Sequence, residues 1–481
     1  MRDKFGPHWY RKPNCETQVS QNEPRNPFVH VSQLGLRDLY KWVSQFIFWF
    51  FCPKRIHERK KESAEKYMLV PGGCFCYNNE SSNSQYSRKT DKEALLKLKS
   101  GFLHGRHFLS SWTGDDCCEW KGISCNKLNG RVTKLDLRFS NLTPVIGPQD
   151  LDDLPLPGRM MFTGDPAIVA LGGKIDSSIC ELKHLTFLYL SFHYLKGEIP
   201  KCIGSLGQLI ELKLAENELV GFVPNTFANL SNLQNLDLRN NYLVANDLEW
   251  LSHLSNLRYL ALSYTNLSRV VEWPSSISKI PYLVELELYA CGLPQVNVKS
   301  ISHMNSSTAL QILHLFENEL NSSILSWVVN VSKVLRFLDL RENSLQSVPD
   351  GFANMISLQY LDLSGNELDG SIIKSFHTLC QLKMLDLSFN KLSDQPSDYL
   401  QKLCSAHDLE YLRLDHNTFI SGPLPDVSRF SSLKMLNLGS ANIIGPLSFV
   451  HLQYLKYLDL SQNGLNGSLP LLEVSKLASL E

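Results

Sequence analysis

The sequence predicts an α/β solenoid, a curved stack of short units whose strands form one parallel β-sheet on the concave side. The first observation behind this is a recurring pattern, L-x-x-L-x-L-x-x-N-x-L, found in 13 copies. The second is its spacing, because successive copies from Leu185 onward begin 22 to 27 residues apart. The third is that residues 1–100 contain 7 leucines whereas the other 381 residues contain 74. A unit with one apolar face becomes stable only by stacking on its neighbours.

Each copy supplies one strand. Clear examples are LIELKLAENEL from Leu209 and LQYLDLSGNEL from Leu358. Two leucines that lie two positions apart share one face of a strand and point into the core. With strands about 4.8 Å apart, the sheet is an arc on the order of 60 Å long. The other copies begin at Val132, Leu185, Leu233, Leu257, Leu283, Leu310, Leu335, Leu382, Leu409, Leu433 and Leu455.

The asparagine of the pattern lies where the chain turns after the strand. A buried side-chain amide there can bond backbone groups that the turn leaves unpaired. Four copies lack the asparagine and have His193, Thr265, Cys291 or Ala441 instead. Cysteine is a known substitute at this position, but alanine cannot form the bond. We therefore expect local weakness at Ala441.

Composition and motifs exclude several classes. With 47 basic and 48 acidic residues the net charge is -1, so the chain is not basic throughout as a nucleic-acid-binding chain would be. No run of 18 apolar residues occurs, and no ordinary membrane-spanning helix is encoded. Phosphate-loop, H-E-x-x-H and G-x-S-x-G motifs are absent, as are paired C-x-x-C spacings. We expect no enzyme activity, no metal and no cofactor.

Glycine and proline follow several strands in a fixed pattern, as in LKGEIP ending at Pro200, LVGFVP ending at Pro224 and LNGSLP ending at Pro470. This variant resembles the plant-specific class of leucine-rich repeats over roughly residues 185–481. Longer phrases, such as DLEWLSHLSNLRYLALSYTNLS from Asp247 and LVELELYACGL from Leu283, resemble plant receptor-like proteins without a kinase, of the kind that detect fungal xylanase.

The resemblance implies perception at the cell surface in plant immunity. It implies a protein, peptide or microbial elicitor as ligand, and co-receptor kinases as signalling partners. Two alternatives use the same repeat: a secreted inhibitor of a microbial cell-wall-degrading enzyme, like the polygalacturonase inhibitors, and the ectodomain of a receptor kinase. A truncated gene product without function is a further alternative.

Before the repeats, Leu95, Leu98 and Phe102 recur at helical spacing, which predicts an amphipathic helix from about Asp91 to Gly101. A solenoid needs a cover for its open end. Residues 87–131, with the motif Cys-Cys-x-Trp-x-Gly-x-x-Cys from Cys117, resemble the amino-terminal cap of plant leucine-rich-repeat receptors.

In that family the cap motif implies a disulfide between Cys118 and Cys125. It also implies that Cys117 bonds a cysteine near position 87, but Ser87 occupies that place. Either Cys74 or Cys76 substitutes, or Cys117 is unpaired.

The remaining segments are irregular. Residues 1–86 lack the order of a signal peptide, since the bases follow the apolar cluster Trp42–Cys52. The cluster is either a membrane-surface helix or part of an unrelated leader, and we favour the leader. Residues 132–481 hold the repeats, with a loop inserted at 143–170. Residues 477–481 resemble the opening of a fourteenth strand, so we expect a fragment of a longer ectodomain.

Two features favour an oxidising, extracellular compartment: the cap cysteines and the sequons. Cys380 and Cys404 lie 24 residues apart on successive units and are either a disulfide or two buried thiols. We expect a location on the extracellular side of the cell membrane, with attachment only through a segment absent from this chain. The candidate N-glycosylation sites from the cap onward are Asn141, Asn229, Asn266, Asn305, Asn321, Asn330 and Asn466.

The candidate ligand-binding residues lie on the concave side, where strand positions beside the leucines face solvent. The usual residue between the two leucines is Asp, as at Asp237, Asp339, Asp362, Asp386 and Asp459. Aromatic, histidine and arginine residues depart from this pattern in the fifth to eighth units, and exposed aromatics with arginine are typical interface anchors. Alternatively, these rings only cover one another. The departures are Tyr259, Tyr264, Tyr289, His314, Phe316, Phe337 and Arg341.

Overall fold

The computed structural model describes residues 80–138, 170–297, 309–331, 333–404, 408–446 and 455–467, which all lie in one unit, Tyr77–Glu481. Several predictions fall outside these residues. They are the leader up to residue 79, the loop at 143–169, the fourteenth strand at 477–481, and the sequons at Asn141 and Asn305.

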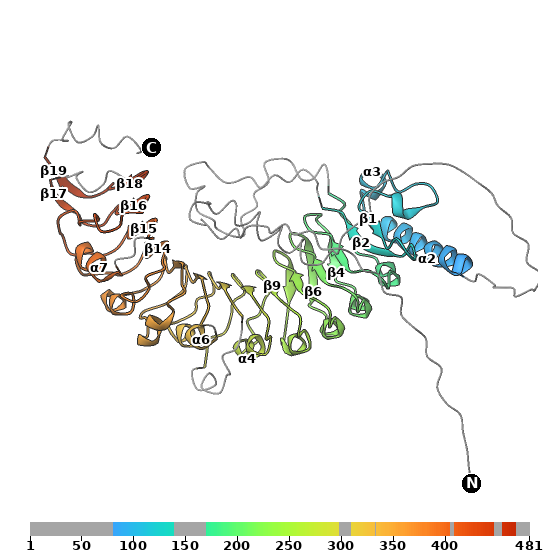
Figure 1. The fold of residues 1–481 in the computed structure, drawn as a ribbon, viewed down its shortest axis with the longest axis horizontal. Coiled ribbons are helices and arrows are strands. Elements are labelled where there is room, and N and C mark those ends of the chain that lie inside the picture. The colour runs from blue at the N-terminus through green and yellow to red at the C-terminus, as the bar shows by residue number, and fades with distance from the viewer. Residues whose placement is uncertain are drawn as a thin grey trace, which may run out of the picture. The chain divides into compact units, whose positions relative to one another are not determined.

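A 14-stranded sheet runs through the described residues, and its strands follow one another in chain order (Figure 1). β1 (Ile123–Cys125) pairs antiparallel with β2 (Val132–Asp136), and all later pairs are parallel. Every one of the 13 repeat copies supplies one strand, which confirms the predicted solenoid. The later strands are β3 (Phe187–Tyr189), β5 (Glu211–Lys213), β7 (Asn235–Asp237), β9 (Tyr259–Ala261), β10 (Glu285–Glu287), β11 (Ile312–His314), β12 (Phe337–Asp339), β13 (Tyr360–Asp362), β14 (Met384–Asp386), β15 (Tyr411–Arg413), β16 (Met435–Asn437) and β18 (Tyr457–Asp459).

Short helices return the chain along the outer side of the curve (Figure 1). Between these two sides the leucines form one continuous core; Leu212 and Leu214, for example, are fully buried. The helices are α4 (Trp273–Ser278), α6 (Ser323–Val331), α7 (Pro396–Lys402), η3 (Ser177–Glu181), η4 (Lys201–Ser205), η5 (Asn225–Asn229), η6 (Glu249–His253), η7 (Asp350–Asn354) and η8 (Gly370–Ser375).

A second, smaller sheet forms where the chain leaves the main one. It consists of β4 (Lys196–Glu198), β6 (Glu218–Phe222) and β8 (Tyr242–Val244), paired in parallel. Gly197 and Gly221 lie in these strands with φ of 81° and 85°, a conformation that glycine adopts without steric cost. A similar pair, β17 (Ile444–Pro446) and β19 (Gly464–Asn466), lies near the other end.

The asparagine column joins each unit to the one before it, as predicted. In Asn217 the Nδ2 group donates to the carbonyl of Leu190 in the preceding unit at 2.9 Å and to that of Leu214 at 3.0 Å. Its Oδ1 accepts from the backbone N–H of Leu195, also in the preceding unit, at 3.0 Å. Asn241, Asn343, Asn366 and Asn390 repeat this pattern.

Two of the substitutes replace part of this bonding. The His193 ring places Nε2 2.8 Å from the carbonyl of Leu137 in the preceding unit. Burial lowers the pKa of His193 to about 4, so the ring is neutral at ordinary pH. The Cys291 thiol lies 3.4 Å from the carbonyl of Leu262. Both side chains therefore satisfy the carbonyl that an asparagine would bond.

Ala441 makes no such bond. The backbone N–H of Phe419 occupies the place that Leu195 has beside Asn217, and it has no hydrogen-bond partner within the described part of the chain. Ala441 itself is fully buried. A buried donor without a partner costs about 1–3 kcal/mol.

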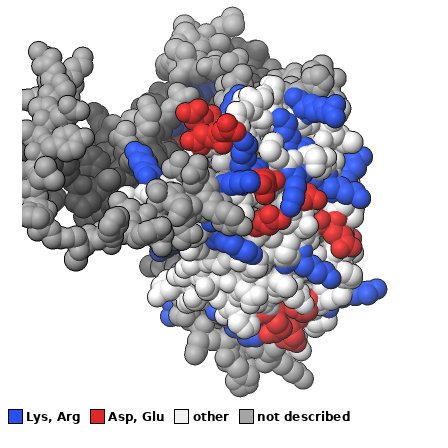
Figure 2. Space-filling model, turned by 90° about the vertical axis from the view of Figure 1, so that its right-hand side faces the viewer, with Lys and Arg blue, Asp and Glu red and all other residues white. Residues whose placement is uncertain are grey.

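The cap contains α2 (Glu80–Gly101), α3 (Gly105–Phe108) and η1 (Cys117–Glu119). Helix α2 begins at Glu80 rather than at the predicted Asp91. Residues 81–90 contain no glycine or proline that would end a helix, but they also lack the apolar periodicity from which a helix is predicted. The buried Asp91 accepts from the backbone N–H of Val132 at 2.9 Å and pairs with Arg131 at 2.8 Å, so it attaches the cap to the first repeat strand. On the cap end of the molecule, basic and acidic side chains are interspersed (Figure 2).

Three disulfides are present among the described residues. Cys118–Cys125 lies in the cap and Cys380–Cys404 joins successive units. Cys180–Cys202, between η3 and η4, was missed by the sequence analysis, although its separation of 22 residues is also about one repeat. Cys117 is a buried thiol without a disulfide partner among the described residues, and burial raises its pKa to about 11. Its two candidate partners, Cys74 and Cys76, lie outside these residues. No helix in the described ranges is long and apolar enough to cross a membrane.

We predict that the amide of Phe419 exchanges its hydrogen faster than that of Leu345, which bonds Asn366 at 3.0 Å. Ala441→Asn should slow exchange at Phe419 at least about fivefold, since restoring one bond to a buried donor is worth about 1–3 kcal/mol. Asn366→Ala is the matched control and should accelerate exchange at Leu345. Hydrogen exchange with mass spectrometry measures both, and equal exchange at the two unaltered amides would contradict the weakness at Ala441.

Candidate ligand-binding surface

The concave face is a regular grid of side chains. Alternate residues of a strand share one face, so Glu285 and Glu287 of β10 face the concave side and Tyr289 continues their line past the strand. Adjacent strands are in register, so Tyr259, Glu285 and Ile312 lie side by side. Residues at equivalent positions of successive repeats are therefore neighbours in space.

Four of the seven predicted ligand-binding residues form a continuous row, here called the aromatic stack: Tyr264, Tyr289, Phe316 and Arg341. The rings of Tyr264 and Tyr289 meet edge to face at 5.6 Å. Tyr289 and Phe316 stack in parallel, with centroids 4.2 Å apart, and the Arg341 guanidinium lies 4.3 Å above the Phe316 ring. The row crosses four successive units. Tyr264 is 50% exposed, and the other three are partly exposed.

Two predicted residues are not available to a ligand, so the expectation that all seven are exposed was wrong for them. His314 is 3% exposed and Phe337 is 7% exposed. Their rings lie 4.7 Å apart, and the Phe337 ring also contacts Tyr360. Side chains on adjacent strands about 4.8 Å apart cover one another when both are large. The alternative that aromatic rings merely cover each other is correct here.

The aspartates between the leucines are also not solvent-facing. Asp339 and Asp386 are buried, and each accepts a hydrogen bond from the backbone N–H two residues later, that of Arg341 at 3.2 Å and that of Ser388 at 2.9 Å. They hold the turn that follows each strand. Of the five aspartates, only Asp459 is partly exposed.

A charged cluster lies beside the aromatic stack. Arg239 of the fourth unit reaches across the small Ala261 and donates to Glu287 at 2.7 Å. The hydroxyl of Tyr259 donates to the same carboxylate at 2.8 Å, so Tyr259 is partly engaged in holding Glu287. Glu285 forms no ion pair among the described residues.

Two carboxyl groups of this cluster have raised pKa values. Burial raises the pKa of Asp237 to about 6, with Arg239 opposing the effect. Burial together with repulsion from Glu287 raises the pKa of Glu285 to about 7. Carboxyl groups are therefore crowded on this part of the concave face, and these two keep their protons to a higher pH than an ordinary carboxyl group does.

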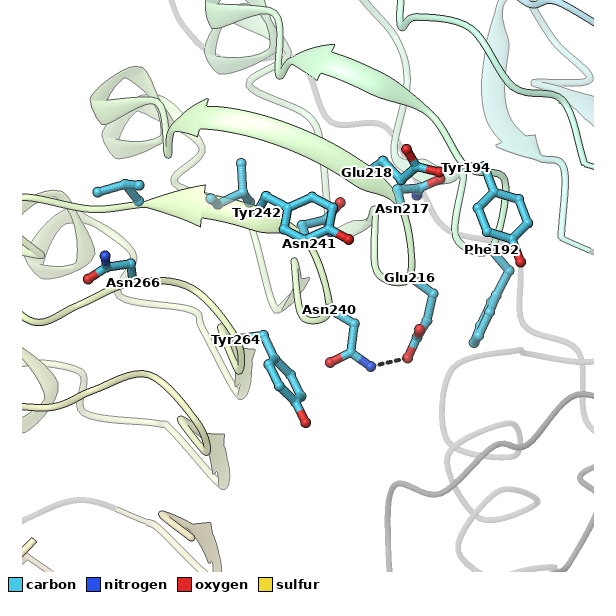
Figure 3. A pocket seen from close by; sticks show the side chains of 12 residues that line it. Phe192, Tyr194, Glu216, Asn217, Glu218, Asn240, Asn241, Tyr242, Tyr264 and Asn266 are labelled. Atoms are coloured by element: carbon cyan, nitrogen blue, oxygen red, sulfur yellow. Dashed lines mark hydrogen bonds between the residues drawn. The ribbon is translucent and has the colours of Figure 1, made fainter. Parts of the chain in front are cut away.

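A pocket of about 800 Å³ lies beside the concave sheet, where the units turn into the second sheet (Figure 3). The sequence analysis missed it, because its walls come from the variable positions on either side of the asparagine column in four units. Within it, Asn240 donates a hydrogen bond to Glu216. Its walls are formed by Phe192, Tyr194, Glu216, Asn217, Glu218, Asn240, Asn241, Tyr242, Leu243, Val244, Tyr264 and Asn266.

The described residues offer few candidate ligands for a metal ion. The one group of potential ligands there is Asp116, Cys117 and Cys118. Cys118 is bonded to Cys125, so only two ligands remain, and these do not make a tetrahedral site.

Family profiles match both the cap and the repeats. The profile of the leucine rich repeat N-terminal domain matches residues 88–126. Leucine rich repeat profiles match residues 183–243, 308–368, 333–392 and 454–473.

The chain is similar to two tomato (Solanum lycopersicum) proteins. It is 36% identical to receptor-like protein EIX2 over 378 residues, which are 77% of this chain and 35% of EIX2. It is 36% identical to receptor-like protein EIX1 over 363 residues, which are 72% of this chain and 33% of EIX1. The chain thus spans about a third of the length of these relatives.

Among solved structures, the chain resembles the ectodomain of the Arabidopsis thaliana receptor kinase GASSHO1/SCHENGEN3, determined in complex with CASPARIAN STRIP INTEGRITY FACTOR 2. The TM-score is 0.61 at 26% identity, over 81% of this chain and 46% of that one.

We predict that Glu285→Gln stabilises the protein at pH 8 and leaves it unchanged near pH 4. Because the folded-state pKa of Glu285 is about 7, above that of an unfolded carboxyl, its contribution to stability is complete below about pH 4 and lost as pH rises through 7. The gain at pH 8 should be up to about 3 kcal/mol. Unfolding followed by circular dichroism at both pH values measures it.

The control is Glu272→Gln, at an exposed carboxylate on the outer side, which should not change the pH dependence. A Glu285→Gln protein that loses stability between pH 4 and 8 as steeply as the unaltered chain would contradict the prediction.

Proposed function

The chain belongs to the leucine-rich-repeat proteins and is related to the plant receptor-like proteins EIX1 and EIX2, and on that premise we propose that it is the extracellular recognition part of such a receptor. Its concave face would bind a microbial protein or peptide, and partner kinases would carry the signal. The relatives are recognition proteins rather than enzymes, in agreement with the sequence analysis.

The observation that carries this proposal is the aromatic stack. Tyrosine and arginine are enriched among the residues that contribute most of the energy in protein interfaces. Here Tyr289 and Phe316 hold each other parallel and Arg341 covers one of them. Side chains ordered before binding lose less conformational entropy when a partner arrives. The stack is thus prepared for a protein partner and is reachable from the concave side.

The disulfides and the N-glycosylation sequons support a location on the extracellular side of the cell membrane. Disulfides persist in oxidising compartments, and three are present in the described residues. All the described sequon asparagines are exposed, as attachment of a glycan requires; they are Asn229, Asn266, Asn321, Asn330 and Asn466.

We predict that replacing Tyr289, Phe316 and Arg341 together by alanine weakens binding of a purified fungal xylanase at least 100-fold. Loss of one interface anchor typically costs about 2 kcal/mol, and about 1.4 kcal/mol is a factor of ten. The measurement is surface plasmon resonance with the secreted chain immobilised.

A matched control replaces Tyr282, Ile356 and Arg269 by alanine, since all three are exposed and lie outside the concave sheet. Its affinity should equal that of the unaltered chain. Failure of the unaltered chain to bind would contradict xylanase as the ligand, whereas unchanged binding by the Tyr289, Phe316 and Arg341 variant would contradict the aromatic stack as the site.

A further inference from the structure

The pocket beside the second sheet has unusually exposed aromatic walls. Tyr242 is 69% exposed, Tyr264 50% and Tyr194 41%. Close by on β6, Val220 and Phe222 are exposed as well. Contiguous apolar surface of this kind is normally covered by a partner or a ligand. The question is what covers it.

Polar groups accompany the rings. The carboxylates of Glu216 and Glu218 and the amide of Asn240 line the same pocket. The Oδ1 oxygen of Asn240 is buried and has no hydrogen-bond partner in the described part of the chain. The pocket thus offers flat apolar faces and hydrogen-bond acceptors together, which suits a ligand that has C–H faces and hydroxyl groups, as a sugar has.

One wall residue can hold such a ligand covalently. Asn266, in the sequon Asn266-Leu267-Ser268, lies at the end of the pocket where Tyr264 projects, with Phe192 and Tyr194 at the other end (Figure 3). Its backbone N–H donates to the carbonyl of Leu243 at 2.9 Å, which fixes it beside β8.

The side chain of Asn266 is oriented for attachment. Its Oδ1 accepts from the N–H of Ser268 at 3.1 Å and from the Ser268 hydroxyl at 2.7 Å. Its Nδ2, the atom that carries an N-linked sugar, has no hydrogen-bond partner among the described residues. Asn266 is exposed, so a substituent on Nδ2 meets solvent and the pocket instead of the core.

We propose that Asn266 carries an N-linked glycan whose first sugar rings pack against Tyr242 and Tyr264 and close this pocket. In the attachment step a bond forms between Nδ2 and the anomeric carbon of the first sugar. The bond from that carbon to the pyrophosphate of a lipid-linked oligosaccharide donor breaks, and Nδ2 loses one proton. Such a donor is met on the secretory route, so the inference rests on the proposed extracellular location.

The packing follows from the chemistry of the two surfaces. An aromatic ring has a negative face, which attracts the slightly positive C–H groups of a sugar ring. Hydroxyl and amide groups of the glycan would donate to the carboxylates of Glu216 and Glu218, which line the pocket. Since Tyr264 also contacts Tyr289, the glycan would border the aromatic stack and limit the ligand-binding surface on that side.

The chain contains a matched sequon without these walls. Asn321, in Asn321-Ser322-Ser323, is exposed, and its Oδ1 accepts from the N–H of Ser323 at 3.0 Å, the same backbone hydrogen bond as at Asn266. Two residues before it stands Glu319, where Tyr264 stands before Asn266, and Asn321 does not line the pocket. A glycan on Asn321 should be mobile, and a glycan on Asn266 should be held.

The experiment expresses the full chain behind a secretion signal in insect cells and maps the glycans by mass spectrometry of peptides. The folded protein is then treated with an endoglycosidase. We expect both asparagines to be occupied and the glycan at Asn266 to be removed at least tenfold more slowly than that at Asn321. Tyr242→Ala with Tyr264→Ala should abolish the difference, and Tyr282→Ala, at an exposed tyrosine elsewhere, should preserve it.

An unoccupied Asn266 beside an occupied Asn321, or equal rates of removal at the two sites, would overturn the inference. So would binding of a free N-acetylglucosamine oligomer in the pocket of the glycosylated protein. None of these outcomes decides whether xylanase binds at the aromatic stack, because the Tyr289, Phe316 and Arg341 variant tests that proposal separately. Conversely, loss of the proposed receptor function would leave the glycan on Asn266 in place.

Discussion

The bond between each asparagine and the backbone of the preceding unit is the interaction on which the rest of the structure depends. Burial of the leucines holds the units together, but the hydrophobic effect is non-directional and does not set the register between units. The Asn217 amide, by contrast, fixes both the separation and the register of two units, because it donates to Leu190 and accepts from Leu195. A strand of three residues would not hold such a register alone. The regularity of the concave grid therefore originates in a column of buried side chains on its edge.

A fixed register determines what the concave side can do. When equivalent positions lie one strand apart, large flat side chains in successive units must meet, and Tyr289 and Phe316 do so in parallel. The same constraint brings carboxylates together. Glu285 and Glu287 share one strand face, and the pKa of Glu285 rises to about 7 as a result of burial and their repulsion. Aromatic stacking and charge crowding are thus two consequences of one geometry, and the sequence decides which occurs in each row.

Much of this geometry could be predicted from the sequence. The 13 strands, their order and the role of the asparagines follow from the period of the pattern, because a period determines neighbours. Burial across the sheet does not follow from it. Asp339 and His314 occupy positions that face the concave side, yet their neighbours cover them, and that depends on the sizes of side chains in two other units. The disulfide Cys180–Cys202 was missed although its separation of 22 residues is about one repeat, because the period alone does not show which residues of the return segments η3 and η4 meet.

The pocket beside the second sheet is a further feature that the repeat pattern does not predict. Tyr242 belongs to one unit, and Tyr264 and Asn266 belong to the next, so no local pattern joins them. They meet because the chain turns out of the main sheet into β8, which places Asn266 beside Leu243. A surface assembled from variable positions in neighbouring units can change without disturbing the leucine core or the asparagine column. The solenoid thereby separates the residues that hold it together from the variable residues on its surface, and this separation lets one stable framework present both an aromatic stack and a pocket.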